Sequence, residues 1–237
     1  FISTPFSKKA VDRLVEFNVP AFKIGSGECN NYPLIEYISN FNKPIILSTG
    51  MNDIKSVAIS VEILKRKKIP YALLHCTNVY PTPFNEVRLN AMLELKKKFP
   101  EAVIGLSDHT INNNVSYAAL GLGASIIERH FIDTKKRKGP DIACSMSPID
   151  LKNLIQASKE IHVSLKGKKI PTKSENITMR FAFASIITTK NIKKGEKITF
   201  KNIWFKRPGT GYFLAKDYKK VIGKTTKKNI KANTHLS

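Results

Sequence analysis

Two histidines are the residues whose spacing in this 237-residue sequence most clearly suggests chemistry. His109 belongs to the run Gly-Leu-Ser-Asp-His-Thr at 105–110, and His130 directly follows Ile-Ile-Glu-Arg at 126–129. The stretch between them is rich in Ala and Gly and has the character of a helix, which predicts neighbouring parallel strands. Such strands deliver both imidazoles to one place, and imidazole suits first-row divalent metals. The spacing therefore predicts a metal site at the mouth of a parallel sheet.

Small polar side chains and one lysine follow the other expected strands. Hydroxyl and amide groups near a lysine can hold a phosphate or a carboxylate. A serine or threonine in such a place can instead cap the helix that follows, but their recurrence at five or six strand ends favours an anion site. The candidates are Thr4, Lys23, Ser26, Ser48, Asn78 and Ser107. Glu28 and Glu128 are carboxylates near the two histidines, whereas Asp108 is expected to point away from them.

Up to about residue 160, short apolar runs alternate with helix-like segments. The expected strands have the apolar character of strands buried on both faces and span 1–4, 21–25, 44–48, 71–76, 103–106 and 125–128. The expected helices span 8–17, 33–41, 53–67, 87–99, 112–122 and 148–165. Polar residues after every strand favour a β/α barrel over a doubly wound sheet, which is decorated only at its switch point.

Six strands are two fewer than a barrel needs, and the sequence does not begin with Met. We therefore expect an α/β fold made of a TIM (β/α)8 barrel lacking its first strands, over residues 1–163. Residues 164–180 are polar and weakly periodic, which predicts a linker. Strand-like runs at 181–188 and 203–205, with a turn at 193–196, predict a small β-rich domain at 181–237.

The formal net charge of +22 could indicate a nucleic-acid partner. The lysines are spread over many segments without a nucleic-acid-binding motif, so a solvated surface that attracts an anionic small substrate is the better interpretation. No apolar run approaches the roughly 20 residues that cross a bilayer, which predicts no membrane partner. Three well-separated cysteines give no disulfide framework or zinc spacing, and the expected compartment is the cytoplasm.

An ordered series of motifs makes the chain resemble the sialic acid synthase family, which comprises N-acetylneuraminate synthases and their legionaminate and pseudaminate relatives. The resemblance covers essentially the whole chain and is carried by the segments at 22–28, 46–51, 75–83, 105–110, 128–131, 139–141 and 206–209. The segments at 25–35 and 76–83 are most similar to the bacterial N-acetylneuraminate synthase branch. The resemblance implies a TIM barrel followed by a small antifreeze-like (SAF) domain.

The resemblance also implies an enzyme of sialic acid biosynthesis, a transferase serving lipooligosaccharide or capsule carbohydrate. It would condense phosphoenolpyruvate with the open-chain aldehyde of N-acetylmannosamine and water, giving N-acetylneuraminate and phosphate. The usual cofactor is Mn²⁺, or another divalent metal such as Mg²⁺ or Co²⁺, and a domain-swapped homodimer is expected. The alternative is a legionaminate synthase that uses 2,4-diacetamido-2,4,6-trideoxymannose. Without the expected first strands, we predict little or no activity for the fragment alone.

Family roles carry over to matching positions of this sequence. His109 and His130 match the metal ligands and, together with Glu28, the catalytic residues. Tyr80 and Asp141 match sugar contacts, and Arg207 matches an arginine that reaches the sugar from the partner's small domain. The phosphoenolpyruvate contacts match Thr4, Lys23, Ser26, Ser48, Asn78 and Ser107.

Two rival functions remain open at this point. A Schiff-base aldolase would need a desolvated lysine on a barrel strand, and Lys23 is the candidate. A basic module that recognises nucleic acid would show steeply salt-dependent binding to oligonucleotides. The metal-assisted condensation requires metal, phosphoenolpyruvate and an amino sugar together, which distinguishes it from both.

Overall fold

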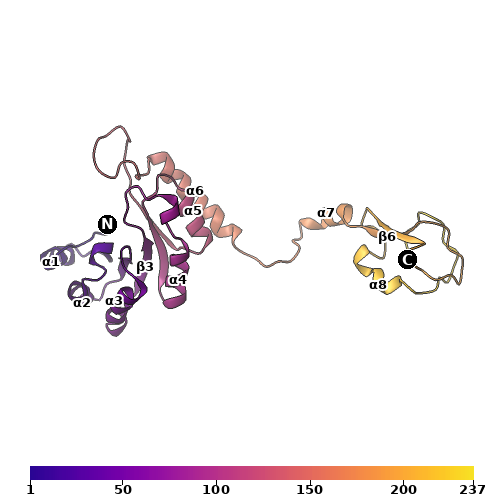
Figure 1. Cartoon of the computed structure of the whole chain (residues 1–237), viewed down its shortest axis with the longest axis horizontal. Coiled ribbons are helices and arrows are strands. Elements are labelled where there is room, and N and C mark those ends of the chain that lie inside the picture. The colour runs from indigo at the N-terminus through magenta and orange to yellow at the C-terminus, as the bar shows by residue number, and fades with distance from the viewer. The chain divides into compact units, whose positions relative to one another are not determined.

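The computed structural model describes residues 1–237 and divides them into two compact units, Phe1–Lys166 and Gly167–Ser237. Figure 1 shows a unit of alternating strands and helices followed in sequence by a smaller, mostly irregular unit. None of the helices combines the length and the apolar character needed to cross a bilayer. Each unit has its own hydrophobic core.

The first unit is built on one five-stranded parallel sheet whose strands lie in the order of the sequence. Every neighbouring pair is parallel, as in a barrel built from successive β/α units. The strands are β1 (Phe22–Ile24), β2 (Ile45–Ser48), β3 (Tyr71–Cys76), β4 (Val103–Asp108) and β5 (Ile126–Arg129). The expected α/β fold, a TIM barrel lacking its first strands, is therefore confirmed as a partial parallel barrel.

Helices precede β1, connect successive strands and follow β5. They are α1 (Lys8–Glu16), α2 (Tyr32–Ser39), α3 (Ile54–Arg66), α4 (Asn90–Lys98), α5 (Asn114–Gly121) and α6 (Pro148–Ser164). Several begin where the sequence supplies an N-cap, because a side-chain oxygen there accepts a free backbone N–H. Ser7 caps α1, Asp53 caps α3, and Ser147 forms a capping box with Asp150 at α6.

Alternation along the strands gives the sheet two different faces. Side chains on one face pack against the helices and form the main core, which includes Phe22, Ile24, Leu47, Leu73 and Leu106. The intervening positions face the other way and become polar toward the strand ends, as the pairing of Cys76 with Ser107 and of Ser107 with Glu128 shows. The register thus brings polar groups from several strands into one row.

Gly105 on β4 is required by close packing on the inner face. A Cβ atom at this position would lie 2.5 Å from the Ile126 carbonyl oxygen and 2.5 Å from a Leu74 methyl group. Backbone on β5 cannot retreat without disturbing the ladder, so a side chain there would force the strands apart. The residue therefore fixes how closely β3, β4 and β5 approach.

A buried ion pair joins β4, β5 and α5. Arg129 Nη1 lies 3.2 Å from Asp108 Oδ2, and both side chains are 1% exposed. The Ser116 hydroxyl donates to the same carboxylate oxygen at 2.6 Å. Arg129 also donates to the Thr110 carbonyl, so the pair holds the loop after β4. Asp108 points away from the strand-end site, as the sequence predicts.

We predict that Asp108→Ala lowers the free energy of unfolding by about 3–5 kcal/mol, because it leaves the Arg129 guanidinium buried without its carboxylate. Chemical denaturation with a spectroscopic readout measures the change. Asp133→Ala is the control, since Asp133 pairs with Arg137 on the surface and its loss should change stability little. Equal effects of the two substitutions would contradict this account of the buried pair.

Two sequence expectations for local secondary structure differ from what the structure shows. The strand expected at 1–4 is reduced to one parallel bridge between Ser3 and Phe22, because pairing with β1 does not extend beyond it. The linker expected at 164–180 contains part of α7 (Glu175–Ala182), which also takes the first residues of the strand expected at 181–188. None of the α7 side chains is fully buried, and none belongs to either hydrophobic core.

The second unit is organised by an antiparallel pair, β6 (Ser185–Thr188) and β7 (Ile203–Lys206). The turn expected at 193–196 is present, and Gly195 adopts φ +85° there. The short helix α8 (Tyr218–Val221) precedes residues 222–225. A small core closes the unit and consists of Ile186, Ile192, Ile198, Ile203, Val221 and Leu236.

Candidate active site

A pocket of about 430 Å³ lies at the carboxyl ends of the parallel strands. Functional residues of β/α barrels occupy this rim, because the loops after the strands converge there. Nine of the twelve predicted site residues line the pocket, namely Thr4, Lys23, Ser26, Ser48, Asn78, Tyr80, Ser107, His109 and His130. The structure thus gathers most of the candidates from six separate segments of the chain.

Lys23 supplies a buried cation at the floor of this pocket. Its Nζ donates to the Ser48 hydroxyl at 2.8 Å and to the Ile24 carbonyl at 3.1 Å. Glu128 Oε2 lies 3.5 Å from the same nitrogen. Burial lowers the pKa of Lys23, and the charge of Glu128 acts in the opposite direction. The ammonium is therefore held in place by polar neighbours while one side faces the pocket.

Glu128 lines the pocket, although the sequence indicates it only as a carboxylate near the histidines, without a role in the site. It lies on β5, accepts a hydrogen bond from the Ser107 hydroxyl at 2.8 Å and contacts the Lys23 ammonium. The signal that identifies it is strand alternation, since residues two apart on a strand share a face. Glu128 is two residues before His130, so a sequence that predicts His130 on the pocket face also predicts Glu128 on that face.

The loop after β2 packs against residues that line the pocket. The Gly50 backbone N–H donates to the Ser26 hydroxyl at 3.0 Å, which ties the ends of β1 and β2 together. Asn78 Nδ2 donates to the Tyr80 hydroxyl at 3.2 Å. A Cβ atom at Gly50 would lie 1.8 Å from Asn78 Oδ1 and 2.9 Å from Ser26 Oγ. Glycine at this position is therefore what allows the predicted anion ligands to converge.

His109 and His130 lie next to each other, with ring centroids 5.3 Å apart. His109 Nδ1 is 3.0 Å from the Thr77 carbonyl, and a carbonyl only accepts, so Nδ1 carries the proton and Nε2 is left as an acceptor. Burial lowers the pKa of His109, which favours the neutral imidazole that metals bind. The Tyr80 ring centroid is 4.1 Å from that of His109.

These residues fit a divalent metal only as a pair of protein ligands. No cluster of three or more His, Cys, Asp or Glu side chains is arranged to hold an ion. His109 is oriented by a backbone carbonyl, an arrangement typical of metal-binding imidazoles, whereas His130 Nδ1 lies 3.8 Å from Asp141 Oδ2, beyond hydrogen-bond distance. A metal held by two imidazoles keeps positions open for oxygen atoms of substrate and water.

Three predicted residues lie outside the pocket lining. Glu28 accepts from Asn31 Nδ2 in the short helix after β1. Asp141 lies at the edge of the pocket beside His130 and adopts φ +61°. Arg207 belongs to the second unit, in the loop after β7. The catalytic role of Glu28 and the sugar-binding roles of Asp141 and Arg207 stay predictions.

We predict that Gly50→Ala weakens phosphate binding at least tenfold, because the new methyl group must displace the Asn78 amide. Titration with inorganic phosphate, followed by calorimetry, measures the loss. Gly27→Ala is the matched control, since a Cβ atom at Gly27 meets no atom within 4 Å. Unchanged affinity in Gly50→Ala would show that Asn78 does not contribute to an anion site.

The fold and the site together define a partial β/α-barrel protein whose strand-end rim gathers a lysine, hydroxyl groups and two imidazoles, with an appended small β domain. The chain belongs to the NeuB family, whose model matches residues 1–170. The SAF domain model matches residues 183–237. The resemblance to the sialic acid synthase family that the motifs indicate is thereby confirmed at the level of the family.

Each match below includes a larger share of this chain than of the relative's own length. An uncharacterized protein of Methanocaldococcus jannaschii is 44% identical over 89% of this chain and 63% of its own length. N,N'-diacetyllegionaminic acid synthase of Campylobacter jejuni is 41% identical over 98% of this chain and 70% of its own. The crystal structure of the N-acetylneuraminic acid synthetase of Leptospira borgpetersenii matches with a TM-score of 0.70 and 33% identity, covering 74% of this chain and 62% of that one.

Proposed function

We propose that the pocket condenses phosphoenolpyruvate with the open-chain aldehyde of an N-acylated amino sugar and water, releasing phosphate and a nonulosonic acid. The observation that carries the proposal is the convergence, on one rim, of a buried cation with hydroxyl donors and of two adjacent imidazoles. Membership of the NeuB family supports it. Since the chain spans about two thirds of the length of the relatives, the proposal concerns the activity of a complete barrel.

The Lys23 side of the pocket binds the phosphate group in this proposal. The Lys23 ammonium supplies charge, and Ser26, Ser48, Ser107 and Asn78 supply neutral donors. Glu128 lies beside the ammonium, and its charge raises the pKa of Lys23 against the larger lowering effect of burial. The same contacts fix the enol carbon of phosphoenolpyruvate in position, so that proximity lowers the barrier to carbon–carbon bond formation.

The imidazole side of the pocket receives the sugar aldehyde. His109 and His130 would hold the divalent metal, Mn²⁺ or another such as Mg²⁺ or Co²⁺, which polarises the carbonyl when bound. Tyr80 lies against both rings and Asp141 Oδ2 lies 3.8 Å from His130 Nδ1, which supports sugar-binding roles for both. Glu28 as a catalytic carboxylate and Arg207 as a sugar contact from a domain-swapped partner complete the proposed site.

Two sugars compete as the natural substrate. The sequence motifs favoured N-acetylmannosamine and hence N-acetylneuraminate as product. The comparisons give more support to the alternative, because the legionaminic acid synthase of C. jejuni is 41% identical to this chain and the Leptospira synthetase 33%. We therefore favour 2,4-diacetamido-2,4,6-trideoxymannose as the sugar and legionaminate as the product.

The decisive experiment measures phosphate release from phosphoenolpyruvate with each sugar, with and without Mn²⁺. It uses the 237-residue chain beside a version extended to restore the expected N-terminal strands. We expect the extended chain to release phosphate only when metal, phosphoenolpyruvate and amino sugar are all present, and faster with the diacetamido sugar. Turnover that survives strong chelation, or borohydride trapping of pyruvate on Lys23, would overturn the mechanism.

We predict that His109→Ala and His130→Ala each abolish tight Mn²⁺ binding, because each removes one of two protein ligands. Electron paramagnetic resonance of free Mn²⁺ reports the bound fraction. His162→Ala is the control, since His162 lies exposed near the end of α6 and outside the pocket. Full Mn²⁺ binding in either single variant would contradict the assignment of the pair.

We predict that Lys23→Met weakens phosphoenolpyruvate binding about 10- to 100-fold, the effect of removing one charge-assisted hydrogen bond. Isothermal titration calorimetry in the presence of Mn²⁺ measures it. Lys55→Met, an exposed position on α3, should leave the affinity unchanged. Equal losses from both substitutions would mean that only the overall positive field of the protein acts on the ligand.

A further inference from the structure

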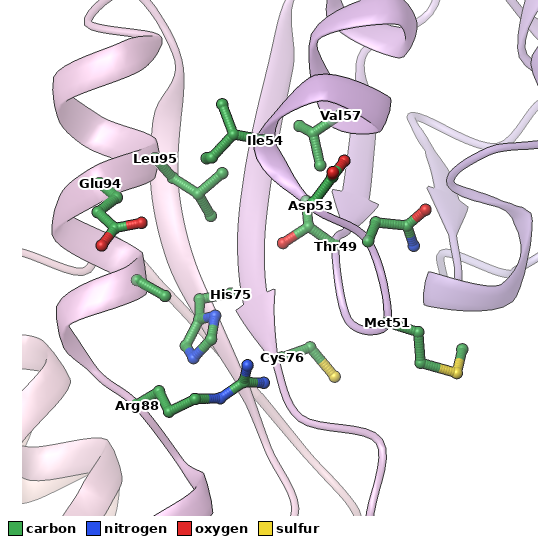
Figure 2. A pocket seen from close by; sticks show the side chains of 12 residues that line it. Thr49, Met51, Asp53, Ile54, Val57, His75, Cys76, Arg88, Glu94 and Leu95 are labelled. Carbon is green, nitrogen blue, oxygen red and sulfur yellow. The ribbon is translucent and has the colours of Figure 1, made fainter.

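A second pocket, the α3–α4 pocket, opens between these two helices (Figure 2). Its volume is about 490 Å³, within the range of small-molecule sites. The lining comes from the loop after β2, the first turn of α3, the end of β3 and the helix α4 with the segment before it. Cys76 alone lines both this pocket and the strand-end pocket, so the two are separate cavities.

His75 points a free hydrogen-bond acceptor into the α3–α4 pocket. The side chain is only 5% exposed, and its Nε2 lies 2.6 Å from the Val87 carbonyl. Because a carbonyl only accepts, Nε2 carries the proton and Nδ1 has none. Burial lowers the pKa of His75 and keeps the ring neutral. Nδ1 makes no hydrogen bond within the protein, so a donor on a ligand would satisfy it.

Arg88 adds a cation that is oriented but not neutralised. Its Nε donates to the Glu86 carbonyl at 3.2 Å, and its Nη2 donates to the Thr77 hydroxyl at 3.3 Å. No carboxylate lies within ion-pairing distance of the guanidinium. Its remaining N–H groups are therefore fixed in direction and available to an anion, and a carboxylate matches that planar arrangement of donors.

The backbone around this pocket is strained at two points. Seven non-glycine residues have positive φ, and four of them are Asn or Asp, which tolerate it. Lys68 directly follows the C-cap of α3, where a left-handed residue is usual. The other two are Met51 (φ +63°) and Arg88 (φ +55°), and both line the α3–α4 pocket. Strain of this kind concentrates at ligand sites.

We propose that the α3–α4 pocket binds a small polyhydroxylated carboxylate, such as a sugar acid. Arg88 takes the carboxylate, while His75 Nδ1 and the Glu94 carboxylate accept from hydroxyl groups. Asp53 also lines the pocket, but it is already engaged as the N-cap of α3. The apolar wall matches the carbon skeleton and consists of Ile54, Val57, Ala91 and Leu95. The mixture of one cation with several acceptors disfavours a simple inorganic anion.

An occupant of this pocket would contact the loop that shapes the strand-end pocket. Asn52 lines the α3–α4 pocket and donates to the Ser26 carbonyl at 3.0 Å and to the Gly50 carbonyl at 2.7 Å. Gly50 in turn donates to the Ser26 hydroxyl. The site is distinct from the proposed condensation site and does not depend on that function being correct.

Binding of gluconate and of N-acetylneuraminate to the 237-residue chain tests the proposal, with neutral glucose as the comparison. We expect both acids to bind and glucose to bind at least tenfold more weakly. Arg88→Gln should weaken the binding of both acids about tenfold or more. Ala91→Phe, which fills the cavity without removing a hydrogen bond, should abolish binding, and circular dichroism checks that this variant is folded.

Two controls separate this site from the rest of the protein. Arg66→Gln removes a matched arginine of α3 outside the pocket and should leave binding unchanged. Lys23→Met disables the strand-end pocket and should also leave binding unchanged. Loss of binding in Lys23→Met but not in Ala91→Phe would place the acids in the strand-end pocket and overturn the proposal. Binding of neither acid to the wild-type chain would overturn it as well.

Discussion

The parallel register of β3, β4 and β5 is the constraint on which the rest of the structure depends. It pairs Cys76 with Ser107 and Ser107 with Glu128, so that inner-face side chains of three strands end in one row. A slip of one residue would turn every one of these side chains toward the helices and expose the apolar face instead. Gly105 acts against such a slip because a side chain in its place would clash with β5. The Asp108–Arg129 pair acts against it because a slip would separate two buried opposite charges.

Opposite charges, those of Lys23 and Glu128, lie side by side in this row before any ligand arrives. A buried ammonium at Lys23 is costly on its own, and Glu128 and the Ser48 hydroxyl compensate it. An anion entering the pocket meets a cation already oriented by the protein. The His109 imidazole is likewise oriented in advance, because the Thr77 carbonyl fixes its ring before any metal binds. Groups oriented before a ligand arrives need little reorganisation when it binds.

The loop after β2 has a wider structural role than its length suggests. Through Gly50 it touches the Ser26 hydroxyl of the strand-end pocket, and through Asn52 it reaches the α3–α4 pocket on the other side of the sheet. Loops that follow barrel strands commonly carry ligand contacts, because the rigid sheet fixes where these loops begin and end. Here one connection contacts a lining residue of the strand-end pocket and itself lines the α3–α4 pocket, which has an apolar wall.

The sequence by itself determined the alternating parallel architecture, because short apolar runs between amphipathic segments report burial on both faces of a sheet. It also indicated nine of the residues lining the strand-end pocket, most of them because they end or follow an expected strand, and Lys23 because it lies near them. Only the tertiary structure showed the contacts of the two carboxylates: Glu128 meets Lys23 and Ser107 in the strand-end pocket, whereas the three-residue helix after β1 holds Glu28 outside the lining. The α3–α4 pocket likewise required the structure, because its residues come from segments far apart in the chain, and their convergence depends on helix packing that no local pattern records.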